Sequence, residues 1–276
     1  MITRSIHDLP YLSSVSSSVC PFAVAWAARV VANGGAAPSK ETQTAICAFQ
    51  TGLVSDGLDT KMIAWNAIVP DNLVAATTPQ LVGSGGNDPW TNHNFVGGDL
   101  TVNGLTGDAS TKYLDSGIRR VLSPFGIAGY VYNATQTGCS VGGTNGTSFW
   151  ANVMAKYVTG NYFMRIGLNT QFVSNPTPGN GWFSSQRVST TDFRAFFANS
   201  GNAHTQLGAT DTSLYTGGSN LSSAVTTHSD ANAGNQFFSS DTISAVFITT
   251  GLTPTEDAAL FARVQTLRQA LGGGFV

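Results

Sequence analysis

The chain has 276 residues, of which 42% are hydrophobic and only 10% are charged, and its formal net charge is −2. This length suits one large β domain or two small ones, and the hydrophobic share is enough for a sizeable core. Charge is far below the usual quarter of residues, and its near-neutral balance excludes a basic surface of the kind that holds nucleic acid or anionic lipid.

The first 19 residues form a polar arm, and the stretch from residue 13 to residue 18 is almost entirely serine. Such a composition buries too little apolar surface to form a core. We expect either a disordered tail or an arm that orders against another protein. In the second case the serines would anchor the chain in an assembly: Ser13, Ser14, Ser16, Ser17 and Ser18.

We interpret residues 20–80 as a helical N-terminal extension that packs on the main domain. Its first part has apolar residues at helical spacing and ends at an Asn-Gly pair, and Ser39 then suits the N-cap of a second helix. The expected elements are helices over residues 21–31 and after Ser39, a strand over 62–69, and a short helical piece over 71–76.

From residue 81 to the end, short apolar runs are separated by clusters of Gly, Asn, Asp and Thr about every ten residues. Even spacing with turn signals predicts the strands of an antiparallel sandwich. Residues 211–235 are so polar that we expect a long loop with one short strand. The expected strands are 99–102, 112–115, 125–133, 149–154, 162–168, 181–186, 192–198 and 242–248.

The last of these strands organises the domain. Residues 242–248 are apolar on both faces, which predicts an interior strand. Simple alternation places Ile243, Ala245 and Phe247 on one face of it.

A C-terminal amphipathic helix follows this strand. Thr253 and Glu256 have the spacing of a capping box, and Gly272 is suited to end the helix. An apolar stripe faces the sheet in this interpretation, and Arg268 lies away from it. The stripe consists of Leu260, Val264, Leu267 and Leu271.

The three cysteines, Cys20, Cys47 and Cys139, are an odd number at wide spacing, which suggests neither a disulfide framework nor a zinc site. We expect buried free thiols. The sequence has no apolar run of the roughly 18 residues that a membrane span needs, and residues 21–31 lack the basic start of a signal peptide. We therefore expect a chain made and kept in a cytoplasm until assembly or lysis.

Three segments follow a familiar pattern: residues 94–99 (NFVGGD), residues 105–117 (LTGDASTKYLDSG), and residues 251–253 together with the helix that ends at Leu271. They resemble the concanavalin A-like (laminin-G-like) jelly-roll domains of bacteriophage tail and virion surface proteins. The resemblance implies an all-β fold, in which two antiparallel sheets of six or seven strands form a sandwich over residues 81–276. Short N-terminal helices and the C-terminal amphipathic helix complete it.

The function implied by this resemblance is that of a structural protein without enzyme activity on the surface of a virion, as a capsid decoration, head fibre or small tail-tip subunit. Its partners would be other virion proteins and further copies of itself, for example in a homotrimer, without nucleic acid or membrane insertion. A carbohydrate-binding adhesin that recognises a host surface glycan is the alternative, and a glycoside hydrolase is less favoured.

Hydrolysis of a glycosidic bond needs two carboxylates that flank it. The two glutamates, Glu41 and Glu256, fall in the first turns of expected helices, where they complement the helix dipole. Asp99 could pair with Asp108 or Asp115, but roles in turns are favoured. We therefore expect no catalytic residue.

Metal binding is not expected either. The histidines lie far apart in expected loops or in the arm, without the spacing of metal ligands; they are His7, His93, His204 and His228. An oxygen-rich loop with Asn87, Asp88, Asn92 and Asn94 could contribute to a calcium site, although a solvated turn is favoured. The sequence thus predicts no metal and no other cofactor.

Three tryptophans, Trp90, Trp150 and Trp182, fall in or near loops. A flat aromatic ring can stack on a sugar, and an amide beside it can bond to hydroxyl groups. Trp182 with Asn180 is the best candidate for a glycan site, whereas packing inside the sandwich or between subunits is the favoured alternative.

Overall fold

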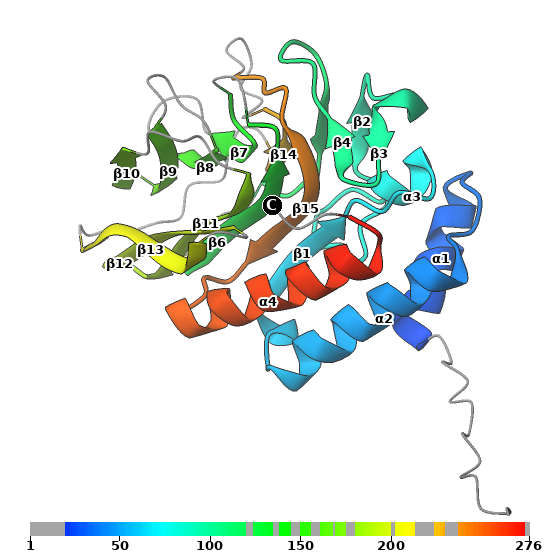
Figure 1. Cartoon of the computed structure of the whole chain (residues 1–276), viewed down its shortest axis with the longest axis horizontal. Helices are drawn as coiled ribbons and strands as arrows, with labels where there is room; N and C mark the ends of the chain where they lie inside the picture. Colours follow the sequence, from blue (N-terminus) through cyan, green and yellow to red (C-terminus); the bar gives the residue numbers. More distant parts are fainter. Residues whose placement is uncertain are drawn as a thin grey trace, which may run out of the picture.

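Two antiparallel sheets face each other in the computed structural model (Figure 1). It describes residues 20–119, 124–134, 138–144, 150–155, 161–167, 169–174, 180–199, 202–212, 224–229 and 237–273. The predicted all-β sandwich with a C-terminal helix is confirmed. The serines proposed as an anchor, Ser13 to Ser18, lie outside the described residues.

Sheet A has eight strands in the order β13-β12-β11-β6-β15-β4-β3, and β1 also pairs with β15. Because β1 belongs to this sheet, the sandwich already begins within the segment interpreted as an extension. The strands are β1 (Met62–Ala67), β3 (Leu100–Thr101), β4 (Gly104–Thr106), β6 (Phe125–Tyr132), β11 (Gly181–Ser189), β12 (Asp192–Asn199), β13 (Asn202–Asp211) and β15 (Thr242–Thr249).

Sheet B has seven strands in the order β10-β9-β8-β7-β14-β5-β2. Its short strand β14 is the one expected within the polar stretch from residue 211 to residue 235. The strands are β2 (Thr91–His93), β5 (Tyr113–Asp115), β7 (Val141–Thr144), β8 (Trp150–Met154), β9 (Asn161–Gly167), β10 (Asn169–Ser174) and β14 (Thr226–Thr227).

Strand β15 is interior, as its two apolar faces predict, since all eight of its residues are buried. The register with β6 shifts between Ile243 and Ala245. This bulge turns Ile243 into the core between the sheets, while Ala245 and Phe247 face the helices. The expectation that all three share one face is therefore wrong, because an inserted residue breaks the two-residue alternation.

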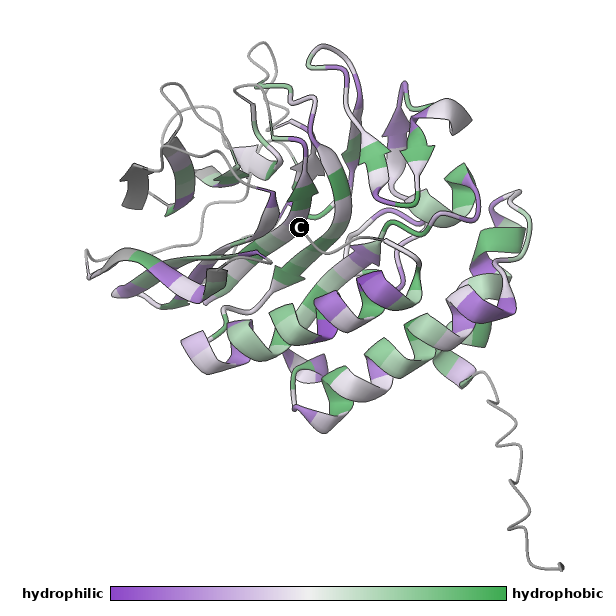
Figure 2. Ribbon diagram, in the orientation of Figure 1, coloured by the Kyte–Doolittle hydropathy of each residue, from purple (hydrophilic) through white to green (hydrophobic). Residues whose placement is uncertain are grey.

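Helices cover the outer face of sheet A and bury their apolar sides on it (Figures 1 and 2). The predicted N-cap at Ser39 and the capping box of Thr253 with Glu256 are both formed. The helices are α1 (Pro21–Ala32), α2 (Lys40–Ser55), α3 (Leu73–Thr77) and α4 (Pro254–Ala270), with single 3₁₀ turns η1 (Asp59–Lys61) and η2 (Gly97–Asp99). Within the described part of the chain, no helix is long and apolar enough to cross a membrane.

A disulfide joins Cys20, at the start of α1, to Cys47 in α2. The expectation of three free thiols is therefore wrong for this pair, whereas Cys139 is buried and takes no part in a disulfide. Wide sequence spacing did not prevent pairing, because α1 and α2 pack side by side on sheet A. The bond fixes the first helix to the second at the point where the described chain begins.

Arg268 corrects the interpretation of α4, because only 1% of this residue is exposed. Its Nη2 donates to the carbonyl of Val102 at 2.6 Å, and the guanidinium carbon lies 5.7 Å from the ring centroid of Tyr132. The sheet thus wraps further around α4 than a single apolar stripe predicts.

Candidate functional site

Strands β5 and β2 form one edge of sheet B, and their register decides which side chains share a face. His93 is paired with Tyr113, and Thr91 with Asp115. Leu114, between Tyr113 and Asp115, is fully buried in the core between the sheets. Side chains alternate along a strand, so Tyr113 and Asp115 lie on the outer face of sheet B, away from sheet A. His93 and Thr91 lie on that face with them.

An aromatic platform stands on this face, formed by His93, Tyr113 and Phe238. The rings of His93 and Tyr113 are stacked, with centroids 3.9 Å apart and planes 7° from parallel. The Phe238 ring lies 6.1 Å from that of Tyr113 and is tilted by 51°. All three residues are partly exposed. The platform is therefore in contact with solvent and is not part of the buried core.

Polar groups lie directly beside the platform. Asp115 accepts a hydrogen bond from the backbone N–H of Gly117 through Oδ1 at 2.7 Å. The Thr91 hydroxyl accepts from Asn87 at 3.1 Å. Burial is the larger cause that raises the pKa of Tyr113, and the negative charge of Asp115 raises it further.

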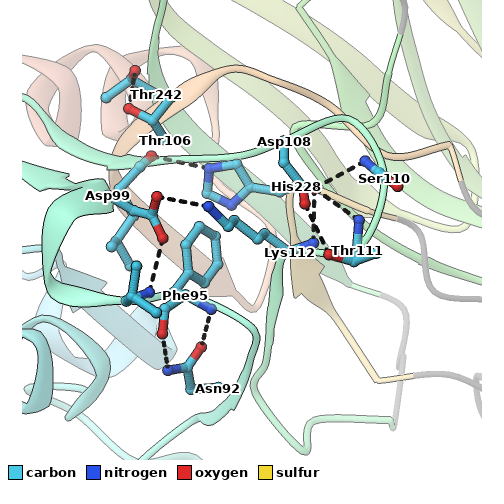
Figure 3. Close-up of polar contacts among 12 residues, drawn as sticks. Asn92, Phe95, Asp99, Thr106, Asp108, Ser110, Thr111, Lys112, His228 and Thr242 are labelled. Carbon is cyan, nitrogen blue, oxygen red and sulfur yellow. Dashed lines mark hydrogen bonds and ion pairs between the residues drawn. The ribbon is translucent and has the colours of Figure 1, made fainter.

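Two loops brace the strands from behind, and Figure 3 shows the contacts between them. The Lys112 ammonium lies 2.7 Å from the Asp99 carboxylate, which also accepts from the Val96 N–H. Asn92 both accepts from and donates to the backbone of Phe95. These contacts fix the chain immediately after His93 and immediately before Tyr113.

Asp108 closes the turn that leads into β5. Its carboxylate accepts from the backbone N–H groups of Ser110, Thr111 and Lys112 and from the Thr111 hydroxyl (Figure 3). Burial raises the pKa of Asp108, but these hydrogen bonds outweigh it and lower the pKa well below its usual range. The Asp108 carboxylate therefore stabilises the turn in which it lies.

His228 lies under these loops and is fully buried, with a left-handed backbone (φ 61°). Its Nε2 lies 3.0 Å from the Leu105 carbonyl and its Nδ1 lies 2.8 Å from the Thr227 hydroxyl. Burial lowers the pKa of His228 to about 4, although hydrogen bonds and nearby aspartates partly offset it. The imidazole is thus a neutral bridge between β4 and β14, which belong to different sheets.

This buried imidazole should make stability depend on pH. The unfolded chain protonates His228 near its ordinary pKa of about 6.5, whereas the folded chain does so only near pH 4. Between these values the unfolded state binds more protons, so the free energy of unfolding falls as the pH falls from 6.5 toward 4. The slope is at most about 1.4 kcal/mol per pH unit.

Urea titrations across that pH range measure this slope. In a His228→Asn variant, whose side chain tolerates a left-handed backbone, the slope should become smaller. An equal slope in the variant and the parent protein would contradict a neutral buried His228.

Each of the aspartates considered for catalysis has a local partner in the structure. Asp99 pairs with Lys112, Asp108 closes a turn, and Asp115 holds Gly117. The predicted roles in turns are therefore confirmed for Asp108 and Asp115. Glu41 and Glu256 lie in the first turns of α2 and α4, as predicted.

The oxygen-rich loop is used internally. Asn87 bonds to Thr91 and Asp115, and Asp88 pairs with Arg29. Asn92 braces Phe95, and Asn94 donates to the Thr111 carbonyl. Among the described residues, no group of three or more His, Cys, Asp or Glu side chains is arranged to hold a metal ion.

Trp182 is not available as a glycan site, which corrects that candidate and agrees with the favoured alternative of packing in the interior. Its side chain is fully buried under α4, and its indole N–H donates to Asp257 at 2.9 Å. Trp90 is buried in the core between the sheets, and Asn180 is partly exposed at the start of β11.

Sequence reasoning missed the platform because His93 and Tyr113 are brought together only by the pairing of β2 with β5. His93 was assigned to a loop, since a three-residue strand of Thr, Asn and His gives no apolar alternation. One signal was present: the strand expected over residues 112–115 places Tyr113 and Asp115 on the face opposite Leu114.

No family model and no curated protein matches the chain. Similar solved structures include domain 4 of a GH43 extracellular arabinanase from Geobacillus stearothermophilus, in complex with arabinotriose. Its TM-score is 0.49 at 13% identity, over 73% of this chain and 98% of that one.

Two further structures have longer chains. A Trypanosoma rangeli sialidase in complex with sialic acid has a TM-score of 0.47 at 10% identity, over 75% of this chain and 33% of that one. A GH54 α-L-arabinofuranosidase has a TM-score of 0.46 at 8% identity, over 75% of this chain and 48% of that one. This chain thus spans less than half of either protein.

These comparisons overturn the expected function. The sequence interpretation was a structural virion protein without enzyme activity, but the three structures come from carbohydrate-active proteins, and none of the three is a virion protein. With TM-scores below 0.5, the likeness transfers none of their substrates or catalytic residues to this chain.

Proposed function

We propose that this chain is a carbohydrate-active domain of concanavalin A-like jelly-roll type, which binds a saccharide on the aromatic platform of His93, Tyr113 and Phe238. The observation that carries the proposal is the parallel stack of His93 on Tyr113, partly exposed on the outer face of sheet B with Asp115 and Thr91 beside it.

The geometry suits a sugar for a physical reason. The C–H groups of a pyranose or furanose form a weakly polar face that packs on a flat aromatic ring, while its hydroxyl groups need partners at the rim. Sites for small molecules commonly combine apolar surface with a few polar groups that fix orientation. Asp115 and Thr91 stand two residues along the strands from Tyr113 and His93, about 7 Å away.

The rigidity of the platform favours binding. The register of β2 with β5 pairs the two residues that carry the stacked rings, and the Asp99–Lys112 pair holds the preceding loop. A preformed site loses less conformational entropy when a ligand binds. The carbohydrate-active proteins found by comparison agree with the proposal but do not carry it.

Removal of the Tyr113 ring tests the proposal. In titration calorimetry against a panel of plant, bacterial and animal oligosaccharides, the parent protein should bind at least one saccharide. Tyr113→Ala should weaken that binding about tenfold or more, because it removes half of the stacked pair. Tyr113→Phe keeps the ring and should retain most of the affinity, and Val54→Ala on α2 serves as a distant control.

Equal binding by Tyr113→Ala and the parent protein, or no binding to any member of the panel, would contradict the proposal. The same samples should be assayed for release of reducing sugar, since a bound saccharide that is cleaved would add an activity to the binding site.

A further inference from the structure

We infer that the platform selects uncharged saccharides over those that carry a carboxylate, such as sialic or uronic acids. This inference rests on the proposed function, because it concerns the ligand of the same site. It is carried by the charges that the strands and loops place around His93 and Tyr113.

Asp115 places a carboxylate on the face of sheet B that carries the platform. It lies on the same face as Tyr113, opposite Thr91. Its Oδ1 is held by the Gly117 N–H, so the carboxylate has a fixed position. A sugar hydroxyl can donate to a carboxylate, and such charge-assisted bonds are stronger than neutral ones. The Asp115 carboxylate repels a ligand carboxylate that approaches it.

Lys112 does not cancel the negative charge that Asp115 places beside the platform. It precedes Tyr113 by one residue, so alternation along the strand places it on the opposite face, and its ammonium lies 2.7 Å from the Asp99 carboxylate. The positive charge of Lys112 is therefore paired with the Asp99 carboxylate and does not offset the charge of Asp115 on the outer face. Asp108, in the loop that leads to the same strand, adds a third carboxylate, which its hydrogen bonds keep ionised.

These four groups thus bring three carboxylates and one ammonium to this end of the sandwich. Two like charges about 7 Å apart repel each other weakly in water and more strongly beside a protein surface. We therefore expect an uncharged ligand to bind several-fold to about tenfold more tightly than a matched acidic one. Added salt should narrow the difference, because it screens exposed charges.

Ligand pairs that differ essentially in charge provide the test: the methyl ester of sialyllactose with free sialyllactose, and the methyl ester of trigalacturonic acid with the free acid. The parent protein should favour the uncharged member of at least one pair. Asp115→Asn, which keeps the shape of the side chain, should reduce that preference, and sodium chloride at about 0.5 M should do the same. Glu41→Gln, an exposed carboxylate at the start of α2, should leave it unchanged.

Equal or tighter binding of the acidic member, or a preference that persists in Asp115→Asn, would overturn the inference while leaving saccharide binding intact. If no saccharide of the panel or of these pairs binds, or if Tyr113→Ala binds them as well as the parent protein does, the proposed function fails and the inference fails with it.

Discussion

Replacement of Asp257 by alanine should lower the free energy of unfolding by about 3–5 kcal/mol. Asp257 lies in the first turns of α4 and is fully buried. Its carboxylate accepts hydrogen bonds from three side chains on two strands of sheet A. The donors are the Trp182 indole at 2.9 Å, the His204 imidazole at 2.7 Å and the Ser184 hydroxyl.

The size of this effect follows from what remains after the substitution. Alanine would leave the three donors buried or nearly buried without their acceptor, and an unsatisfied buried polar group costs about 1–3 kcal/mol. The position near the N-terminus of α4 also favours the negative charge. Asp257 therefore fixes the position of α4 on β11 and β13. The apolar stripe of α4 stabilises the same contact by burial, which is not directional.

Chemical denaturation of the Asp257 variants measures this contribution. Asp257→Asn should lose less stability than Asp257→Ala, since its amide oxygen can still accept. Glu256→Gln is the matched control: it changes the neighbouring acidic residue, which is partly exposed, and should cost about 1 kcal/mol or less. A loss below about 1 kcal/mol for Asp257→Ala would show that the network does not hold α4.

Loss of the Cys20–Cys47 disulfide should lower the free energy of unfolding by about 3–4 kcal/mol. The two cysteines are 27 residues apart, and a cross-link across a loop of this length restricts the unfolded chain. The double variant Cys20→Ala/Cys47→Ala should therefore melt at a lower temperature than the parent protein purified without reductant.

Thiol titration in denaturant provides an independent count. The oxidised chain should show one thiol, from Cys139, and the reduced chain three. Reductant should lower the melting temperature of the parent protein but leave that of the double variant unchanged. Three thiols before reduction would contradict the disulfide. Since such bonds persist in oxidising surroundings, the protein must be prepared without reductant.

The elements with strong local signals could be predicted from the sequence. The Ser39 cap, the Thr253–Glu256 capping box and the apolar periodicity of α1 and α4 are local patterns, and each of them is present in the fold. Long apolar strands such as β6, β12 and β15 were also predicted, since a strand that is buried on one or both faces has a recognisable run or alternation of apolar residues.

Features that depend on pairing between distant segments could not be predicted. The bulge beside Ile243 places this side chain on the opposite face of β15 from Ala245 and Phe247, and only the register with β6 reveals it. Trp182 was a candidate for a glycan site beside the favoured alternative of packing, and only the fold shows that α4 covers that face of β11. Cys20 and Cys47 meet only because two helices pack together. The platform of His93 and Tyr113 likewise exists only through the pairing of β2 with β5.

A crystal structure of the protein with a bound saccharide, chosen as the tightest ligand of the panel, tests the central claim most directly. We predict a sugar ring packed on the face of His93, Tyr113 or Phe238, with a hydroxyl group within hydrogen-bond distance of Asp115 or Thr91. Well-defined saccharide at another face of the sandwich, with the platform in contact only with solvent, would contradict the account.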